Sequence, residues 1–341
     1  MIRILIVFFI FFHLFIHTSK INNNLKIKNN FGTYNPINHI KKTEKKNIIL
    51  GTIVKYSLKT VATFFNSLIH SNFTNCDVVM FVRKIRSTLI NYLKNIGVIL
   101  IPISKKYNNI QITKLRWKLY FEYLKERKNE YNLVFTTDIR DVVFQKDIFK
   151  YYENHKSFLG LAIEDNFLNQ TTNKQWIVDY VGEKIYRKIQ NERIICFGTI
   201  WGSIDKILEF SSIFYEKVLF NNNSTDQGIG NYLFYYEKFL NDFIIKSDNF
   251  GPVMTIGFTN ISNIHLDSNY NILNFKGEIA SVIHQYYGKK NISKKIMVKF
   301  LNNKYQRHSI INFVLFSHLL ILFLFSKKQI LLNVRRLKLK K

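Results

Sequence analysis

Two periodicities alternate between residues 47 and 138, and this alternation restricts the fold more than any other feature of the chain. Short apolar runs with β-branched residues predict strands at 47–54, 77–83, 98–103 and 131–138. Amphipathic segments between them predict helices at 58–71, 86–97 and 114–129. Strands joined through helices run parallel with right-handed crossovers. The sequence therefore predicts an α/β fold, with a mainly parallel central sheet and flanking helices.

The pattern becomes less regular after residue 150. A strand pair or strand–turn is predicted at 193–203, and helices follow at 204–220 and 228–242. Later apolar runs predict strands at 251–258 and 278–288. The chain has 341 residues, which is enough for one large domain, and we place that domain at residues 47–300.

Both ends of the chain carry apolar segments that are typical of targeting or anchoring. Residues 1–19 resemble a signal peptide or signal anchor, and the lysine- and asparagine-rich residues 20–46 are predicted to be a stem. Residues 310–326 are just long enough for a transmembrane helix, and the basic tail 327–341 is expected in the cytosol. This topology places residues 47–300 in the lumen of the endoplasmic reticulum or Golgi.

The net charge of +27 is compatible with nucleic acid or an anionic membrane surface as partner. Outside the tail, however, the basic residues are scattered, and no nucleic-acid-binding motif occurs. We therefore expect no nucleic acid among the partners and retain the lipid bilayer. The two cysteines, Cys76 and Cys196, exclude a cysteine zinc cluster and leave one disulfide open.

The predicted fourth strand ends at a pair of carboxylates, Asp138 and Asp141, and the apolar run VVF follows at once. Ligands of parallel sheets bind at the carboxyl ends of strands, and two acids there can hold Mg²⁺ or Mn²⁺. Taken alone, such acids are more often turn-capping residues. Three later segments change this balance: CFGTIWGS with two glycines, STDQGIGNYL with an acid and an amide, and SVIHQYYG with a histidine.

In this order, together with GPVMTIGF, these segments resemble nucleotide-sugar glycosyltransferases of the Rossmann-like GT-A fold, over about residues 47–290. TTDIRDVVFQ looks like a D-x-R-D-V-x-F-Q variant of the DxD-type metal site. The resemblance implies that Asp138, Asp141 and His284 hold Mn²⁺ or Mg²⁺, and that the metal binds the diphosphate of a UDP-sugar. It further implies transfer of a hexose to a glycan or protein acceptor, and we expect a retaining outcome.

The same resemblance implies roles for six further residues. Asp226 and Gln227 would face the donor sugar or acceptor as catalytic residues, with a helix N-cap as the alternative for Asp226. Donor binding is assigned to Gly198 and Gly202, whose missing side chains let backbone approach a ligand, and to two arginines. Arg140 is expected to pair with an acid or phosphate. Arg116, one helix before the site, is a candidate to reach the nucleotide, although a surface helix charge is the slightly favoured alternative.

Three positions depart from the pattern of these glycosyltransferases. Phe197 stands in place of a small polar residue, and Tyr287 and Gly288 stand where a charged pair is common. These departures leave open a catalytically inactive, membrane-tethered scaffold of the same fold. An aspartyl-phosphate phosphatase or phosphotransferase is disfavoured, because its acid pair would follow the first strand of the core. A membrane protein without enzymatic activity would leave the ordered segments unexplained.

Overall fold

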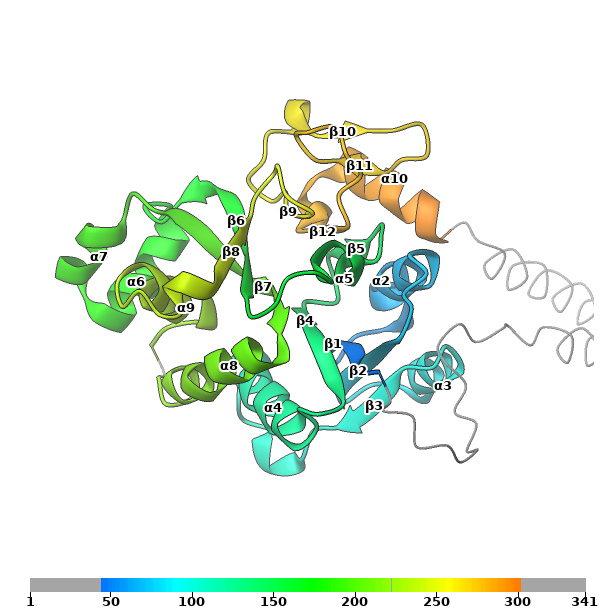
Figure 1. Ribbon diagram of the computed structural model, residues 1–341, viewed down its shortest axis with the longest axis horizontal. Helices are drawn as coiled ribbons and strands as arrows, with labels where there is room; N and C mark the ends of the chain where they lie inside the picture. Colours follow the sequence, from blue (N-terminus) through cyan, green and yellow to red (C-terminus); the bar gives the residue numbers. More distant parts are fainter. Residues whose placement is uncertain (1–43, 222, 302–341) are drawn as a thin grey trace, which may run out of the picture.

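The N-terminal alternation folds as predicted in the computed structural model, which describes residues 44–221 and 223–301 (Figure 1). Its strands are β1 Lys46–Val54, β2 Cys76–Arg83, β3 Ile99–Pro102 and β4 Tyr131–Thr137. Its helices are α2 Leu58–His70, α3 Ser87–Asn95 and α4 Ile112–Glu126, with a short 3₁₀ turn at Lys105–Tyr107. β1 pairs in parallel with both β2 and β4, and β2 pairs in parallel with β3.

The described residues after β4 extend this sheet with strands of both directions, in the order β3-β2-β1-β4-β7-β6-β9-β12-β5, with β8 beside β6. These strands are β5 Val142–Phe144, β6 Leu159–Phe167, β7 Arg193–Ser203, β8 Ile244–Ser247, β9 Val253–Thr255 and β12 Val282–His284. β7 is antiparallel to both neighbours, and β5 is antiparallel to β12. The other pairs in this sheet are parallel. The sheet is therefore mixed and mainly parallel.

Helices and short elements complete the described fold. The helices are α5 Ile148–Tyr152, α6 Thr171–Val181, α7 Glu183–Ile189, α8 Ile204–Leu219, α9 Asp226–Tyr235 and α10 Lys290–Leu301. A separate hairpin pairs β10 His265–Leu266 with β11 Ile272–Leu273, and 3₁₀ turns lie at Asn241–Phe243, Ile261–Asn263 and Tyr286–Gly288. α10 packs beside α2, where the side-chain amide of Asn66 donates to the carbonyl of Phe300 at 2.8 Å (Figure 1).

Some predicted elements differ in extent from those observed. The segment 193–203 is one continuous strand, not a strand pair. The helix predicted at 228–242 ends at Tyr235, because Lys238 and Leu240 adopt left-handed backbone with φ of 55° and 54°. The strands predicted at 251–258 and 278–288 shorten to the three residues of β9 and of β12.

The predicted terminal segments cannot be compared with the structure. Residues 1–19, most of the stem 20–46, the span 310–326 and the tail 327–341 lie outside the described residues. Among the helices of residues 44–301 that are described, none combines the length and apolar character needed to cross a membrane.

Phe197, one of the departures noted in the sequence, belongs to the hydrophobic core. Its ring is 2% exposed and lies 5.2 Å from the ring of Phe214, 6.1 Å from Trp117 and 6.2 Å from Phe234, between centroids. Gly230 on α9 makes room for it, because a Cβ at that glycine would overlap the Phe197 ring. The Phe197 side chain is therefore part of the hydrophobic core and does not line a binding site.

This packing predicts that Phe197→Ala lowers the free energy of unfolding by about 3–5 kcal/mol, because a large buried ring leaves a cavity. Phe220→Ala is the matched control, since that ring is 83% exposed and its loss should cost less than about 0.5 kcal/mol. Denaturant titration of both variants measures the difference. Equal stabilities for the two variants would contradict the assignment of Phe197 to the core.

Candidate metal site

The turn after β4 is held in place from both sides. The backbone N–H of Asp138 donates to the carbonyl of Gly198 at 2.7 Å, and Ile139 is buried, at 2% exposed. The chain then enters β5, whose first residue, Val142, pairs with His284 of β12 in antiparallel register. The apolar run VVF therefore places Asp141 beside a strand that lies more than a hundred residues later in the sequence.

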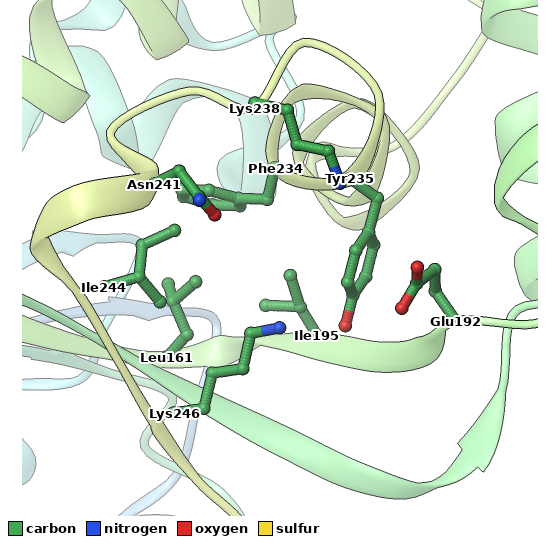
Figure 2. Close-up of a pocket in the computed structure, with 9 residues that line it drawn as sticks. All are labelled: Leu161, Glu192, Ile195, Phe234, Tyr235, Lys238, Asn241, Ile244 and Lys246. Carbon is green, nitrogen blue, oxygen red and sulfur yellow. The ribbon is translucent and has the colours of Figure 1, made fainter.

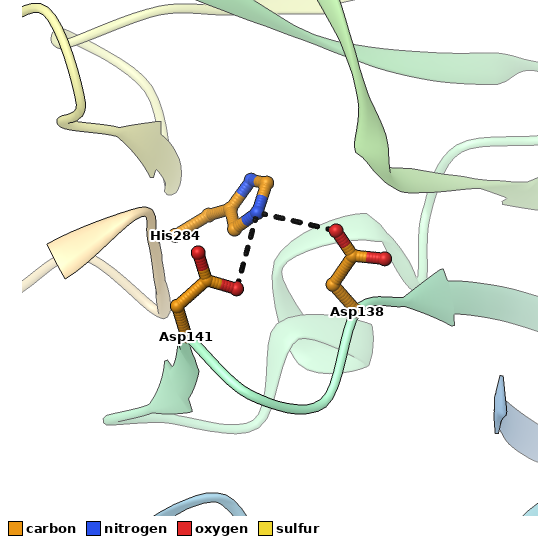
Figure 3. A group of neighbouring side chains, drawn as sticks. All are labelled: Asp138, Asp141 and His284. Atoms are coloured by element: carbon orange, nitrogen blue, oxygen red, sulfur yellow. Dashed lines mark ion pairs between the residues drawn. The ribbon is translucent and has the colours of Figure 1, made fainter. Parts of the chain in front are cut away.

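The three predicted metal ligands come together at this turn (Figure 3). Nε2 of His284 lies 3.7 Å from Oδ2 of Asp138 and 3.8 Å from Oδ1 of Asp141. One ligand atom from each residue lies within 4.8 Å of the others. His284 is 2% exposed, whereas the side chain of Asp138 is 40% exposed, so the group opens to solvent on the side of the acids.

The chemistry of this group fits a divalent cation. Two carboxylates and one neutral imidazole suit Mn²⁺, and Mg²⁺ is the harder, more oxygen-preferring alternative. Gly198 makes the convergence possible, because a Cβ there would overlap the His284 ring and lie 2.8 Å from Oδ2 of Asp138. Gly198 therefore serves the candidate ligands directly, by leaving the space in which they pack.

Arg116 is the central cation of the site and is buried, at 6% exposed. Its Nη1 donates to Oδ1 of Asp138 at 2.6 Å, and its Nη2 donates to Oδ2 of Asp226 at 2.6 Å. Nη2 also donates to the carbonyl of Phe197 at 2.8 Å. The alternative of a surface helix charge is therefore wrong, because the guanidinium points from α4 into the protein.

The charges in this cluster shift one another's pKa values. Burial alone would raise the pKa of Asp138, but Arg116 outweighs it and holds that pKa below its usual value. Burial likewise disfavours charged Arg116, yet Asp226 and Asp138 raise its pKa. For His284, burial acts to lower the pKa, whereas Cys196 and Asp138 raise it well above its ordinary value. At each of these three side chains, the interactions with neighbouring groups therefore outweigh the effect of burial on the pKa.

Asp226 and Gln227 lie behind the metal residues and are held by other parts of the protein. Oδ2 of Asp226 accepts from Arg116 and from Nε1 of Trp117 at 3.1 Å. The N-cap of α9 is Thr225, whose side chain accepts from the backbone of Gly228, so the N-cap alternative for Asp226 is wrong. The amide of Gln227 donates to Asn173 at 2.9 Å and accepts from the backbone N–H of Phe197 at 3.4 Å. The catalytic roles of Asp226 and Gln227 stay predictions.

The other two predicted donor-binding residues, Arg140 and Gly202, differ in their surroundings. Arg140 is exposed, and its guanidinium carbon lies 5.9 Å from the ring centroid of Tyr287. The expected acidic partner is not seen, because Arg140 forms no ion pair with any described residue. Gly202 pairs with Val134 inside the sheet, where a Cβ would overlap the carbonyl oxygen of Phe158. Close packing of β6 on β7 explains Gly202, and the structure does not bring it to the metal residues.

Sequence reasoning missed three residues close to the candidate ligands. Glu164 is 1% exposed on β6, and Cys196 is 1% exposed on β7, next to His284. Burial raises the pKa of Cys196 to about 11 and also raises the pKa of Glu164. Tyr56 follows β1, and burial and then Asp138 raise its pKa. Two features of the sequence could have pointed to these residues. Glu164 interrupts the apolar run LGLAIEDNF, and Tyr56 lies just after the end of a predicted parallel strand.

A pocket on another part of the sheet contains none of the predicted site residues (Figure 2). It lies between α9, the following turn and strands β6 to β8, and it is lined by Leu161, Glu192, Ile195, Phe234, Tyr235, Lys238, Asn241, Ile244 and Lys246. Several of its apolar residues belong to the core cluster that contains Phe197.

No protein-family model matches the chain, and no curated protein matches its sequence. Solved structures with a similar arrangement include galactosyltransferase LgtC in complex with donor and acceptor sugar analogues, at 14% identity and a TM-score of 0.41, covering 73% of this chain and 95% of that chain. The bifunctional glycosyltransferase WbbM matches at 14% identity and a TM-score of 0.46, over 78% of this chain and 51% of its own. The glycosyltransferase GlyE of Streptococcus pneumoniae TIGR4 matches at 14% identity and a TM-score of 0.43, over 78% of this chain and 64% of its own. At this identity and TM-score, the similarity establishes neither an activity nor membership of a family.

The packing at Gly198 predicts that Gly198→Ala weakens Mn²⁺ binding at least about tenfold, because the new methyl group displaces His284 or Asp138. Gly288→Ala is the matched control, since a Cβ there meets no atom within 4 Å. Mn²⁺ titration followed by electron paramagnetic resonance measures the free ion, and thermal unfolding shows that both variants fold. Equal Mn²⁺ affinity in the two variants would contradict the proposed convergence.

The buried pair of Arg116 and Asp226 predicts an asymmetric response to substitution. Arg116→Met leaves the Asp226 carboxylate buried without its partner and should destabilise the protein by about 3–5 kcal/mol. The double variant Arg116→Met/Asp226→Leu removes both charges and should recover to within about 2 kcal/mol of the wild type. Denaturant titration tests this, and a double variant less stable than Arg116→Met would show that the pair is not coupled as described.

Proposed function

We propose that this chain is a metal-dependent glycosyltransferase of the GT-A type, which transfers a hexose from a UDP-sugar to a glycan or glycoprotein acceptor. One observation carries the proposal: Asp138, Asp141 and His284 converge from two distant segments at the carboxyl end of β4. The ordered segments that resemble such glycosyltransferases include all three residues. The resemblance and the geometry therefore point to the same atoms.

The bound cation, Mn²⁺ or Mg²⁺, would supply charge that binds the donor diphosphate and offsets the negative charge on the departing UDP. Asp138 and Asp141 would contribute the oxygen ligands, and His284 would contribute Nε2. The exposed side chain of Arg140, next to Asp141 in sequence, is proposed to bind the diphosphate, because Arg140 forms no ion pair with any described acid. An oxocarbenium-like transition state at the sugar is expected, as in glycoside hydrolysis.

Arg116 is proposed to orient Asp138, and not to contact the nucleotide. Its 2.6 Å hydrogen bond occupies Oδ1, which leaves Oδ2 directed toward His284. Asp226 holds Arg116 from the other side, so its support of the reaction is indirect. Gln227 likewise fixes the backbone of Phe197, one residue before Gly198. These contacts support positioning roles for Asp226 and Gln227, beside the catalytic roles predicted from the resemblance.

The setting and stereochemistry rest on the sequence. The apolar segments 1–19 and 310–326 support a membrane-attached enzyme of the endoplasmic reticulum or Golgi, with its catalytic domain in the lumen. The late histidine ligand supports a retaining outcome, since glycosyltransferases that resemble this chain in that respect are mostly retaining.

The test is UDP-sugar hydrolysis by the full-length chain in detergent, with Mn²⁺ and with the metal chelated. Asp138→Asn and Asp141→Asn should each lower kcat/KM about 100-fold or more, because each removes a ligand of the charge-stabilising cation. Asp242→Asn, at an exposed acid in a 3₁₀ turn, should leave the rate unchanged.

Two outcomes would count against the proposal in different ways. Metal-dependent hydrolysis that survives both substitutions would show that the cation binds elsewhere. Failure of the wild type to bind UDP with Mn²⁺ would favour the inactive scaffold of the same fold.

A further inference from the structure

The second ring nitrogen of His284 faces the protein interior. Nε2 points to Asp138 and Asp141 (Figure 3). Nδ1 lies 3.4 Å from Sγ of Cys196. When a histidine binds metal through Nε2, its Nδ1 carries the hydrogen and needs an acceptor. In most metal sites that acceptor is a carboxylate or a backbone carbonyl, whereas here the hydrogen-bond partner of Nδ1 is a buried thiol.

A carboxylate lies one step further back. The side-chain amide of Gln285 donates to Oε1 of Glu164 at 3.1 Å and to Sγ of Cys196 at 3.7 Å. Glu164 sits opposite Thr255 on β9, and Thr255 sits opposite His284 on β12, so the carboxylate and the imidazole lie in one row across the sheet. Glu164 is therefore tied to His284 through two hydrogen-bonded side chains.

Two unfavourable features meet at this point of the fold. Glu164 is a carboxyl group that is 1% exposed, and removing such a group from water is costly. Gln285 adopts left-handed backbone with φ of 60°, which disfavours a residue with a side chain. Its amide packs against Gly257, where a Cβ would overlap Oε1 of Gln285. Such local costs cluster at functional sites, where the surrounding structure maintains them.

We propose that Cys196, Gln285 and Glu164 are positioning residues, which form a hydrogen-bonded chain that holds the His284 ring with its Nδ1 hydrogen inward and its Nε2 lone pair toward the cation. The carboxylate of Glu164 orients the amide of Gln285. The amide and the imidazole both donate to the sulfur of Cys196. The backbone N–H of Gln285 donates to the carbonyl of Asp141 at 2.9 Å, so the same residue also fixes the second acid.

This inference rests on the metal site of the proposed function, and its test measures the ion without any sugar donor. Full-length wild type and variants are titrated with Mn²⁺, alone and with UDP, and thermal unfolding of each is recorded without metal. Cys196→Ala removes the acceptor and should weaken Mn²⁺ binding about 10–100-fold. Cys76→Ala is the matched control, because Cys76 is the other buried cysteine and does not contact His284.

Cys196→Ser separates positioning from packing. A hydroxyl restores an acceptor, so the order of Mn²⁺ affinity should be wild type, then Ser, then Ala. If Cys196 only filled space, the serine variant would bind no more tightly than the alanine variant, because a hydroxyl packs less well in an apolar setting. Gln285→Gly should also lower Mn²⁺ affinity about tenfold, because the amide that donates to Cys196 and Glu164 is lost while glycine still accepts the left-handed backbone.

The outcomes distinguish this inference from the proposed function. Weaker Mn²⁺ binding in Cys196→Ala and Gln285→Gly, with partial rescue in Cys196→Ser, supports the chain of positioning residues. Mn²⁺ affinity in Cys196→Ala within twofold of Cys76→Ala overturns it and leaves the metal site standing. A wild type that binds no Mn²⁺, alone or with UDP, overturns both.

Discussion

One buried guanidinium, that of Arg116, determines how the acids of this protein are arranged. It lies between Asp138 and Asp226, at 2.6 Å from each, and both Arg116 and Asp226 are almost fully removed from water. A buried charge is tolerated only when paired and hydrogen-bonded, so the cation and its two acids are mutually dependent. The interaction joins α4, the end of β4 and the start of α9, and it leaves one oxygen of Asp138 directed toward His284.

A second constraint is geometric and comes from three apolar residues. The strand β5 is only Val142–Phe144, yet its antiparallel pairing with β12 brings the chain after Asp141 against His284. Because Gly198 has no side chain, the His284 ring and the Asp138 carboxylate can both lie against its backbone. The candidate metal site therefore depends on strand pairing and on one glycine as much as on the three ligands themselves.

Much of the fold could be predicted from the sequence, because local periodicity decides the elements between 47 and 138. The rule that ligands bind at the carboxyl ends of parallel strands identified Asp138 and Asp141 as candidate ligands. His284 was identified only by its place in an ordered set of segments. The burial of Arg116 could not be predicted, because its partner Asp226 lies 110 residues away and is reached only through tertiary packing. Glu164 was missed for a similar reason: its hydrogen-bond partner is Gln285, 121 residues later.

The central claim, that a divalent cation binds at these three residues, is tested most directly by anomalous X-ray scattering from crystals grown with Mn²⁺ and UDP. The account predicts a manganese peak at about 2.0–2.3 Å from a carboxylate oxygen of Asp138, a carboxylate oxygen of Asp141 and Nε2 of His284. A peak coordinated by other residues, or UDP bound with no manganese peak at these ligands, would contradict it.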